Sequence, residues 1–80
     1  MCLGIPGLIV ERWVRDDGAI LAQADFDGEL RTVQLNYLPD LQVGDYTIVH
    51  AGFALTRLDA EQAAETLRLM RETGVLAPES

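Results

Sequence analysis

The sequence predicts a mainly β fold: a small OB-like five-stranded β-barrel with a C-terminal α-helix. Three observations carry this prediction. Apolar and polar residues alternate over much of the first two-thirds of the chain, two Asp-Gly dipeptides stand at hairpin spacing, and the last quarter combines a helix-capping signal with apolar residues at helical spacing. Closing short strands into a barrel also removes exposed strand edges. With 80 residues, the chain is expected to form a single domain over residues 1–80.

Two tight turns divide the first three predicted strands. Asp17-Gly18 and Asp27-Gly28 are strong two-residue hairpin signals. The strands that they separate are predicted over residues 8–14, 19–26 and 29–36. The third strand has alternate apolar residues that we expect on one buried face: Val33, Leu35 and Tyr37.

A loop around Pro39 and Gly44 precedes the fourth strand, which we expect over residues 46–51. Gly52 interrupts this strand and marks a bulge or an exposed end, and a short fifth strand resumes over residues 53–57. The alternate residues of the fourth strand share one face: Tyr46, Ile48 and His50.

The C-terminal helix has recognisable start and stop signals. Asp59 is a good N-cap with Gln62 three residues on, Leu58 and Ala63 occupy hydrophobic-staple positions, and Gly74 is suited to the C′ position. The expected division is a barrel with an N-terminal cysteine arm over about 1–57, the helix over about 59–73 and a loose tail over 75–80. The apolar stripe of the helix is Ala60, Ala63, Ala64, Leu67 and Met70.

The charge balance excludes two classes of partner. Thirteen acidic residues against six basic ones, all arginine, give a net charge of −7. Nucleic acid and anionic membrane surfaces repel such a chain, because binding to them depends on Lys and Arg. One cysteine makes no internal disulfide, and the sequence has neither a signal-peptide pattern nor an apolar run long enough to span a membrane. We therefore expect a cytoplasmic protein.

Most of the usual catalytic constellations are missing. One Cys and one His do not fill a zinc site, no glycine-rich loop opens a helix, and Ser80 is the only serine. The paired carboxylates flank the Asp-Gly turns, where turn chemistry explains them: Asp16 with Asp17, and Asp25 with Asp27.

Cys2 is the most informative residue of the chain. A small residue at this position favours removal of Met1, so we expect a mature chain that begins with cysteine. The nearby α-amine would then favour the thiolate, the form that attacks electrophiles and binds soft metals. The alternative is a small apolar residue on a frayed end.

His50 and the Pro6-Gly7 pair also admit two interpretations each. His50 is a structural hydrogen-bonding group, or it pairs with Cys2 as the base of a thiol enzyme, although a chain this short leaves little room for a substrate pocket. Pro6 and Gly7 aim a short arm, Cys2 to Ile5, away from the first strand, or they form an ordinary β-turn that leads into the sheet.

The chain resembles the HypC/HupF family of hydrogenase maturation chaperones. The resemblance rests on the start Met1-Cys2-Leu3-Gly4-Ile5-Pro6-Gly7, on the block Gly44-Asp45-Tyr46-Thr47-Ile48-Val49-His50-Ala51-Gly52-Phe53-Ala54, and on the acidic, alanine-rich helix that follows. It covers essentially the whole chain. The family pattern usually has Gln, Lys or Arg where this chain has Leu8.

This resemblance implies an OB-like barrel with a C-terminal helix and a non-catalytic scaffold in [NiFe]-hydrogenase assembly. It implies two partners, HypD and the precursor of the hydrogenase large subunit. It also implies that Cys2 helps to hold a transient Fe(CN)2CO group, with His50 as a weaker candidate ligand and no permanently bound cofactor. The partner-binding residues that it implies are Cys2, Leu3, Gly4, Ile5, Pro6, Gly7 and His50.

Three other functions remain open from the residues. One is a pure interaction module in which Cys2 is an apolar contact and no iron is bound. Another is a thiol enzyme that uses Cys2 and His50. The third, an OB-like nucleic-acid binder, is disfavoured by the charge of −7.

Overall fold

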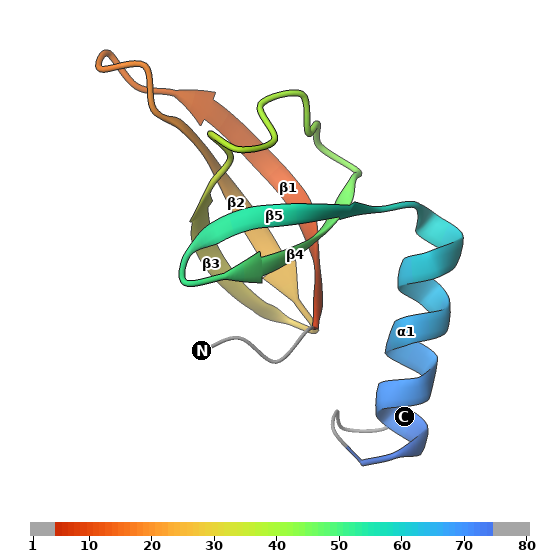
Figure 1. Ribbon diagram of the computed structural model, residues 1–80. Helices are drawn as coiled ribbons and strands as arrows, with labels where there is room; N and C mark the ends of the chain where they lie inside the picture. The colour runs from red at the N-terminus through yellow and green to blue at the C-terminus, as the bar shows by residue number, and fades with distance from the viewer. Residues whose placement is uncertain (1–4, 75–80) are drawn as a thin grey trace.

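The computed structural model describes residues 5–74 and contains a closed five-stranded barrel with one helix beside it (Figure 1). Neighbouring strands follow the order β1-β2-β3-β5-β4, and β4 returns to β1. The predicted barrel and C-terminal helix are therefore confirmed. The elements are β1 (Pro6–Val14), β2 (Ile20–Phe26), β3 (Glu29–Gln34), β4 (Tyr46–His50), β5 (Phe53–Leu58) and α1 (Ala60–Glu72).

The Asp27-Gly28 turn forms as the sequence predicts, whereas the hairpin at Asp17-Gly18 has a three-residue loop, Asp16 to Gly18, closed by a hydrogen bond from the Arg15 N–H to the Ala19 carbonyl. Asp27 and Gly28 join β2 to β3 with φ angles of 56° and 98°, the left-handed pair that matches the twist of a hairpin. The Asp25 carboxylate accepts a hydrogen bond from the backbone N–H of Gly28 at 2.7 Å. At the other turn, Asp17 accepts from the backbone N–H of Ala19 at 3.0 Å. The carboxylates Asp17 and Asp25 thus stabilise turns.

A third tight turn joins β4 to β5 and was not expected in this form. Ala51 and Gly52 have φ angles of 55° and 87°, and His50 pairs directly with Phe53 across the turn. Gly52 therefore completes a two-residue hairpin rather than a bulge or a break. Ala51 carries a Cβ into the left-handed region, which costs about 1 kcal/mol relative to the right-handed region.

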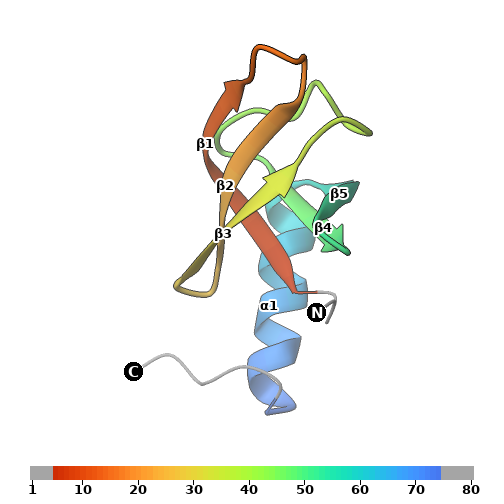
Figure 2. The same cartoon turned by 90° about the vertical axis from the view of Figure 1, so that its left-hand side faces the viewer.

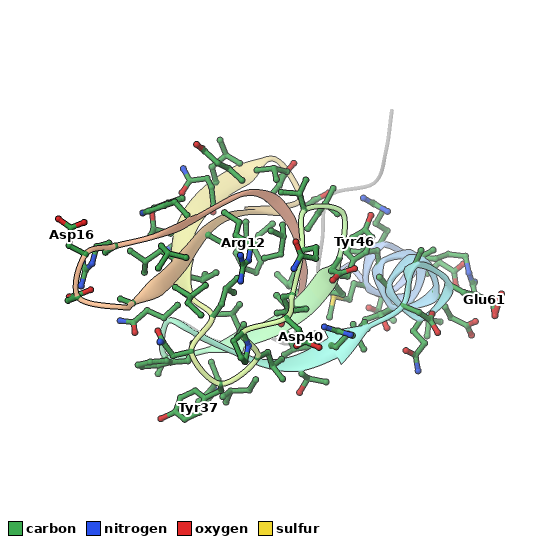
Figure 3. The ribbon with its side chains drawn as sticks, turned by 90° about the horizontal axis from the view of Figure 1, so that it is seen from above. Arg12, Asp16, Tyr37, Asp40, Tyr46 and Glu61 are labelled. Carbon is green, nitrogen blue, oxygen red and sulfur yellow. The ribbon has the colours of Figure 1, made fainter. Side chains whose placement is uncertain are left out.

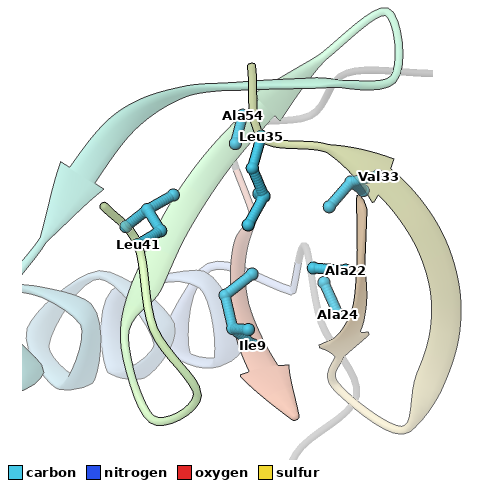
Figure 4. Packing of buried hydrophobic residues seen from close by; sticks show 7 residues of the cluster. All are labelled: Ile9, Ala22, Ala24, Val33, Leu35, Leu41 and Ala54. Carbon is cyan, nitrogen blue, oxygen red and sulfur yellow. The ribbon is translucent and has the colours of Figure 1, made fainter. Parts of the chain in front are cut away.

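Alanines supply three of the seven buried side chains in the core of the barrel (Figure 4). Seven buried side chains form one cluster, which partly buried hydrophobic residues pack against. Tyr37 corrects an expectation: β3 ends at Gln34, and Tyr37 lies in the following turn with 65% of its surface exposed. Val33 and Leu35 are buried as predicted. The cluster consists of Ile9, Ala22, Ala24, Val33, Leu35, Leu41 and Ala54.

The barrel end that carries the β3–β4 loop is bridged by arginine side chains. The Arg12 guanidinium donates to the backbone carbonyl of Pro39 in that loop at 2.5 Å, and Figure 3 shows Arg12 over this end of the barrel. Arg57 of β5 pairs with Asp40 of the same loop at 3.1 Å. These contacts tie the β3–β4 loop across the barrel mouth.

Helix α1 begins with the predicted capping box. The Asp59 carboxylate accepts from the Gln62 backbone N–H at 2.7 Å, and the Gln62 side chain accepts from the Asp59 backbone N–H at 3.1 Å. In its last turn, Arg71 reaches the β2–β3 turn and pairs with Asp27 at 2.9 Å. Figures 1 and 2 show the helix beginning beside β4 and β5 and continuing past the barrel end at which β1 starts. Within residues 5–74, no helix is long and apolar enough to cross a membrane.

The apolar stripe of the helix is narrower than its alanines suggest. Ala63 is buried and Leu67 and Met70 are half-buried, but Ala60 and Ala64 are exposed. A straight helix touches a curved barrel along a short line. Positions at the border of the stripe therefore stay in solvent.

Candidate functional site

The described site residues lie at one end of the β1–β4 ladder. Pro6 and Gly7 begin β1, Ile5 directly precedes them, and His50 is the last residue of β4, which pairs antiparallel with β1. Cys2, Leu3 and Gly4 lie outside the described residues. The structure therefore places the described part of the N-terminal motif beside the histidine block, although the two are far apart in the sequence.

The Pro6-Gly7 pair is part of the barrel wall. Pro6 pairs with Ile48 and Gly7 with Thr47, and both Pro6 and Gly7 are buried. This corrects the expectation that these two residues form a turn or aim an arm, and it moves the start of the first strand from residue 8 to residue 6. Proline is tolerated here because it is the first residue of the strand.

Gly7 is required by a close approach rather than by an unusual backbone angle. A Cβ at this position would lie 2.5 Å from a ring carbon of Phe26. The Phe26 ring therefore packs closely against the backbone of β1 at a position where only glycine leaves room. The close approach at Gly7 is made by an aromatic ring of the neighbouring strand, β2.

His50 is exposed at the end of β4. Phe53, directly across the hairpin, contacts Tyr37 edge-to-face with ring centroids 5.3 Å apart. The three residues form a surface that we call the His50 patch: His50, Phe53 and Tyr37. Phe53 and Tyr37 were not expected in a site, because the sequence suggested a buried position for Tyr37. The two-residue spacing of Ala51-Gly52 is the signal that would have placed Phe53 opposite His50.

A cavity of about 220 Å³ lies where the start of β1, the β2–β3 turn and the β4–β5 hairpin meet. Ile5 lines it from the N-terminal side, and Ala51, next to His50, lines it from the hairpin. The two motifs that the sequence singled out thus border one space. The other lining residues are Phe26, Glu29, Arg31, Thr32, Val33, Val49 and Gly52.

The covalent chain limits the distance between Cys2 and the described residues. Each residue spans at most about 3.6 Å, so the three residue steps from Cys2 to Ile5 allow at most roughly 11 Å between their Cα atoms.

The described residues do not form a metal cage. Within residues 5–74 there is no cluster of three or more His, Cys, Asp or Glu side chains that could hold a metal ion. The two candidate ligands predicted from the sequence are a thiol, Cys2, which lies outside the described residues, and an imidazole, His50.

Asp17 lies at the far end of β1 from the cavity. Its pKa is lowered from the ordinary value, because the Ala19 backbone N–H donates to its carboxylate and Arg15 pairs with it at 2.8 Å. This carboxylate is therefore a turn-stabilising group and not part of the site.

The fold and the site define a small barrel protein whose candidate chemistry lies on a terminal segment and a hairpin rather than in a deep cleft. The model of the HupF/HypC family matches residues 1–70. The chain belongs to this family, so the family predicted from the sequence is confirmed.

Relatives match over most of their length. The chain is 43% identical to a hydrogenase maturation factor HypC of Synechocystis sp., covering 94% of this chain and 100% of the relative. It is 40% identical to HypC of Cupriavidus necator, over 98% of this chain and 82% of the relative. It is 33% identical to hydrogenase maturation factor HybG of Escherichia coli, over 90% of both chains.

Proposed function

We propose that this chain is a hydrogenase maturation factor that acts as a non-catalytic scaffold. It binds HypD and the precursor of the [NiFe]-hydrogenase large subunit and helps to carry an Fe(CN)2CO group on the Cys2 thiolate. The observation that carries the proposal is the family match over residues 1–70, which spans both the Cys2 segment and the His50 hairpin.

The chemistry of the cargo suits a single cysteine anchor. Cyanide and CO are strong-field ligands, so the iron is low-spin and its ligands stay bound while the group changes proteins. A soft thiolate is an appropriate temporary ligand for such iron. One thiolate holds the group weakly enough to release it, whereas a closed set of four ligands would retain it.

The arrangement of the barrel end supports this role. His50 is exposed on the hairpin that borders the cavity, so a partner can contact it without any opening of the core. The three residue steps from Cys2 to Ile5 limit the distance between their Cα atoms to roughly 11 Å. In this proposal, partner binding and cargo transfer take place at one surface.

Substitution of Cys2 tests the proposal. We expect C2A and C2S to fold like the parent chain but to lose the Fe(CN)2CO signal, read as iron content and as the infrared bands of CN and CO in the complex with HypD. Both substituents are small, so removal of Met1 is retained, and an intact mass verifies it. C2A or C2S complexes with full iron content and unchanged bands would contradict a carrier role for the thiol.

Substitution of His50 tests whether this second candidate ligand contacts the partner or binds iron. H50A removes an exposed side chain, so the free energy of unfolding should change by less than about 0.5 kcal/mol. If His50 contacts the partner, H50A weakens binding and leaves the CN and CO bands of the remaining complex in place. If it binds iron, the bands shift.

A pure interaction module is the second candidate, and the His50 patch favours it. Tyr37 is 65% exposed, and aromatic residues of this kind are enriched in protein interfaces. In that case Y37A weakens complex formation, and the iron signal follows HypD alone, whether or not this chain is present.

A further inference from the structure

The cavity lies on the face of β1 that points into the barrel. Ile9 belongs to the core cluster, and a Cβ at Gly7 would meet the Phe26 ring, which also lines the cavity. Ile5, two residues before Gly7, lines the cavity as well. These alternate residues share one face, as side chains of an extended chain do. The next residue of this alternation toward the N-terminus is Leu3, which lies outside the described residues.

The pairing of β1 with β4 leads to the same residue. Their antiparallel ladder ends at the first residue of β1. Continued by one residue, its register sets Ile5 opposite Val49, and both residues line the cavity. Continued by two more, it sets Leu3 opposite Ala51, which lines the cavity from the hairpin. Strand alternation and strand register thus both direct an extended segment before Ile5 to carry the Leu3 side chain to this cavity.

The size and the walls of the cavity suit one aliphatic side chain. Its volume of about 220 Å³ is below the range of roughly 300–1,000 Å³ that is usual for small-molecule sites. Phe26, Val33 and Val49 give it hydrophobic walls, and its two charged lining residues form an ion pair with each other. Two residue steps allow at most about 7 Å between the Cα atoms of Leu3 and Ile5.

We propose that the Leu3 side chain occupies this cavity and that Leu3 is thereby a positioning residue for the Cys2 thiolate. The inference deepens the proposed function and rests on it for the role of the thiol, whereas occupation of the cavity depends on no partner. Covalent attachment favours Leu3 over a side chain from another molecule, because so short a link gives a local concentration of about millimolar or more.

Occupation of the cavity by Leu3 has a consequence for the neighbouring cysteine. Adjacent residues of an extended segment direct their side chains to opposite faces, so the Cys2 side chain would be directed away from the cavity. The thiol would then be accessible to a partner and its iron group. A segment that is already ordered also loses less conformational entropy when the partner binds.

NMR of the free chain tests whether Leu3 occupies the cavity. In a sample with labelled Leu and Val methyl groups, we expect nuclear Overhauser effects between the Leu3 methyls and those of Val33 and Val49. The methyls of Leu69, a helix residue that is 47% exposed, are the negative control. Absence of these effects for Leu3 would overturn the inference, whether or not the chain binds a partner.

Two substitutions of Leu3 give an independent readout. Leu3→Ala removes the side chain from the cavity, whereas Leu3→Met nearly conserves its volume. We expect the order parameter of the Gly4 amide to be about 0.8 in the parent and L3M and below about 0.6 in L3A. Equal values in all three chains would refute the inference. If L3A does not fold, the Leu3 methyl contacts of the parent chain decide.

Binding of HypD tests the positioning role. We expect L3A to bind about tenfold more weakly, because the released segment must be ordered again on binding, and L3M to bind like the parent. V49A changes the cavity wall and not the N-terminal segment, so it should weaken binding in the parent and have no further effect in L3A. Additive losses would mean that Leu3 contacts HypD directly, and they would refute the positioning role.

Failure of this inference is distinguishable from failure of the proposed function. If HypD binds and the Leu3 methyl contacts are missing, the inference is refuted and the proposed function stands. If HypD does not bind the parent chain, or if the C2A complex keeps its iron, the proposed function fails and the positioning role fails with it. The methyl contacts then still decide whether Leu3 occupies the cavity.

Discussion

Replacement of Gly7 by alanine should destabilise the barrel, because the added methyl group would overlap the Phe26 ring. The new Cβ would lie 2.5, 2.6 and 3.0 Å from three carbons of Phe26, where carbon atoms normally approach to about 3.5–4.0 Å. An overlap of about 1 Å forces the ring or strand β1 to move. Overpacking of this kind costs about 1–3 kcal/mol. For a domain of this size each kcal/mol lowers the melting temperature by about 4–8 °C, so G7A should melt roughly 5–20 °C below the parent.

A double-mutant cycle assigns that loss to the ring. Chemical denaturation of G7A, F26A and G7A/F26A gives the three free energies of unfolding. Without the ring, alanine at position 7 should be neutral or should stabilise by up to about 1 kcal/mol, because glycine is unfavourable within a strand. The two substitutions should therefore couple by at least about 1 kcal/mol. Additive effects, or a G7A loss below about 0.5 kcal/mol, would refute the close-approach argument.

Three further measurements follow from the turns and the helix cap. A51N should stabilise the chain by about 0.5–1 kcal/mol in thermal or chemical unfolding, because Asn tolerates the left-handed angle of 55° and Asn-Gly is the favoured turn pair. D59A removes the N-cap carboxylate and should cost about 1 kcal/mol, with the loss localised by exchange of the Gln62 amide. NMR titration of the Asp17 carboxyl should give a pKa below its ordinary value. Because folding lowers this pKa, the carboxylate stabilises the fold at pH values above its unfolded-state pKa. That contribution is lost as the pH falls through the folded-state pKa.

Local sequence signals predicted the parts of the fold that depend on nearest neighbours. Asp27-Gly28 specifies a left-handed turn pair with little help from the rest of the chain, and Asp59 with Gln62 specifies the first turn of the helix. Both are formed by contacts within four residues. Such contacts can be deduced from spacing alone.

The misjudged residues depend on partners far along the chain. Pro6 and Gly7 extend β1 because Ile48 and Thr47 lie alongside, and nothing in the local dipeptide indicates this pairing. Tyr37 continues the alternation of β3 in sequence, but the chain turns after Gln34 and carries it to the surface. The contact of Arg71 with Asp27 spans 44 residues and has no signature in either segment.

The same distinction applies to the candidate site. The motif at Cys2 and the block at His50 were recognisable from the sequence, but their proximity follows from the β1–β4 pairing. The Phe53 and Tyr37 side chains of the His50 patch needed the β4–β5 hairpin and the β3–β4 turn to be known. Exposed side chains of this kind follow no periodicity, so the fold had to be known first.

In the proposed role, the short segment from Cys2 to Ile5 allows different groups to determine which partner binds and how strongly the cargo is held. A thiolate confined within roughly 11 Å of Ile5 has a local concentration at the barrel end of millimolar or more, because the linking segment is short. A partner that docks on the His50 patch therefore meets the thiolate without a further diffusional step. The iron–sulfur bond can then remain weak enough to exchange, since docking supplies the selectivity. It follows that substitution of Tyr37 should change the dissociation constant of the complex, whereas substitution of Cys2 should abolish transfer even in a complex that has already formed.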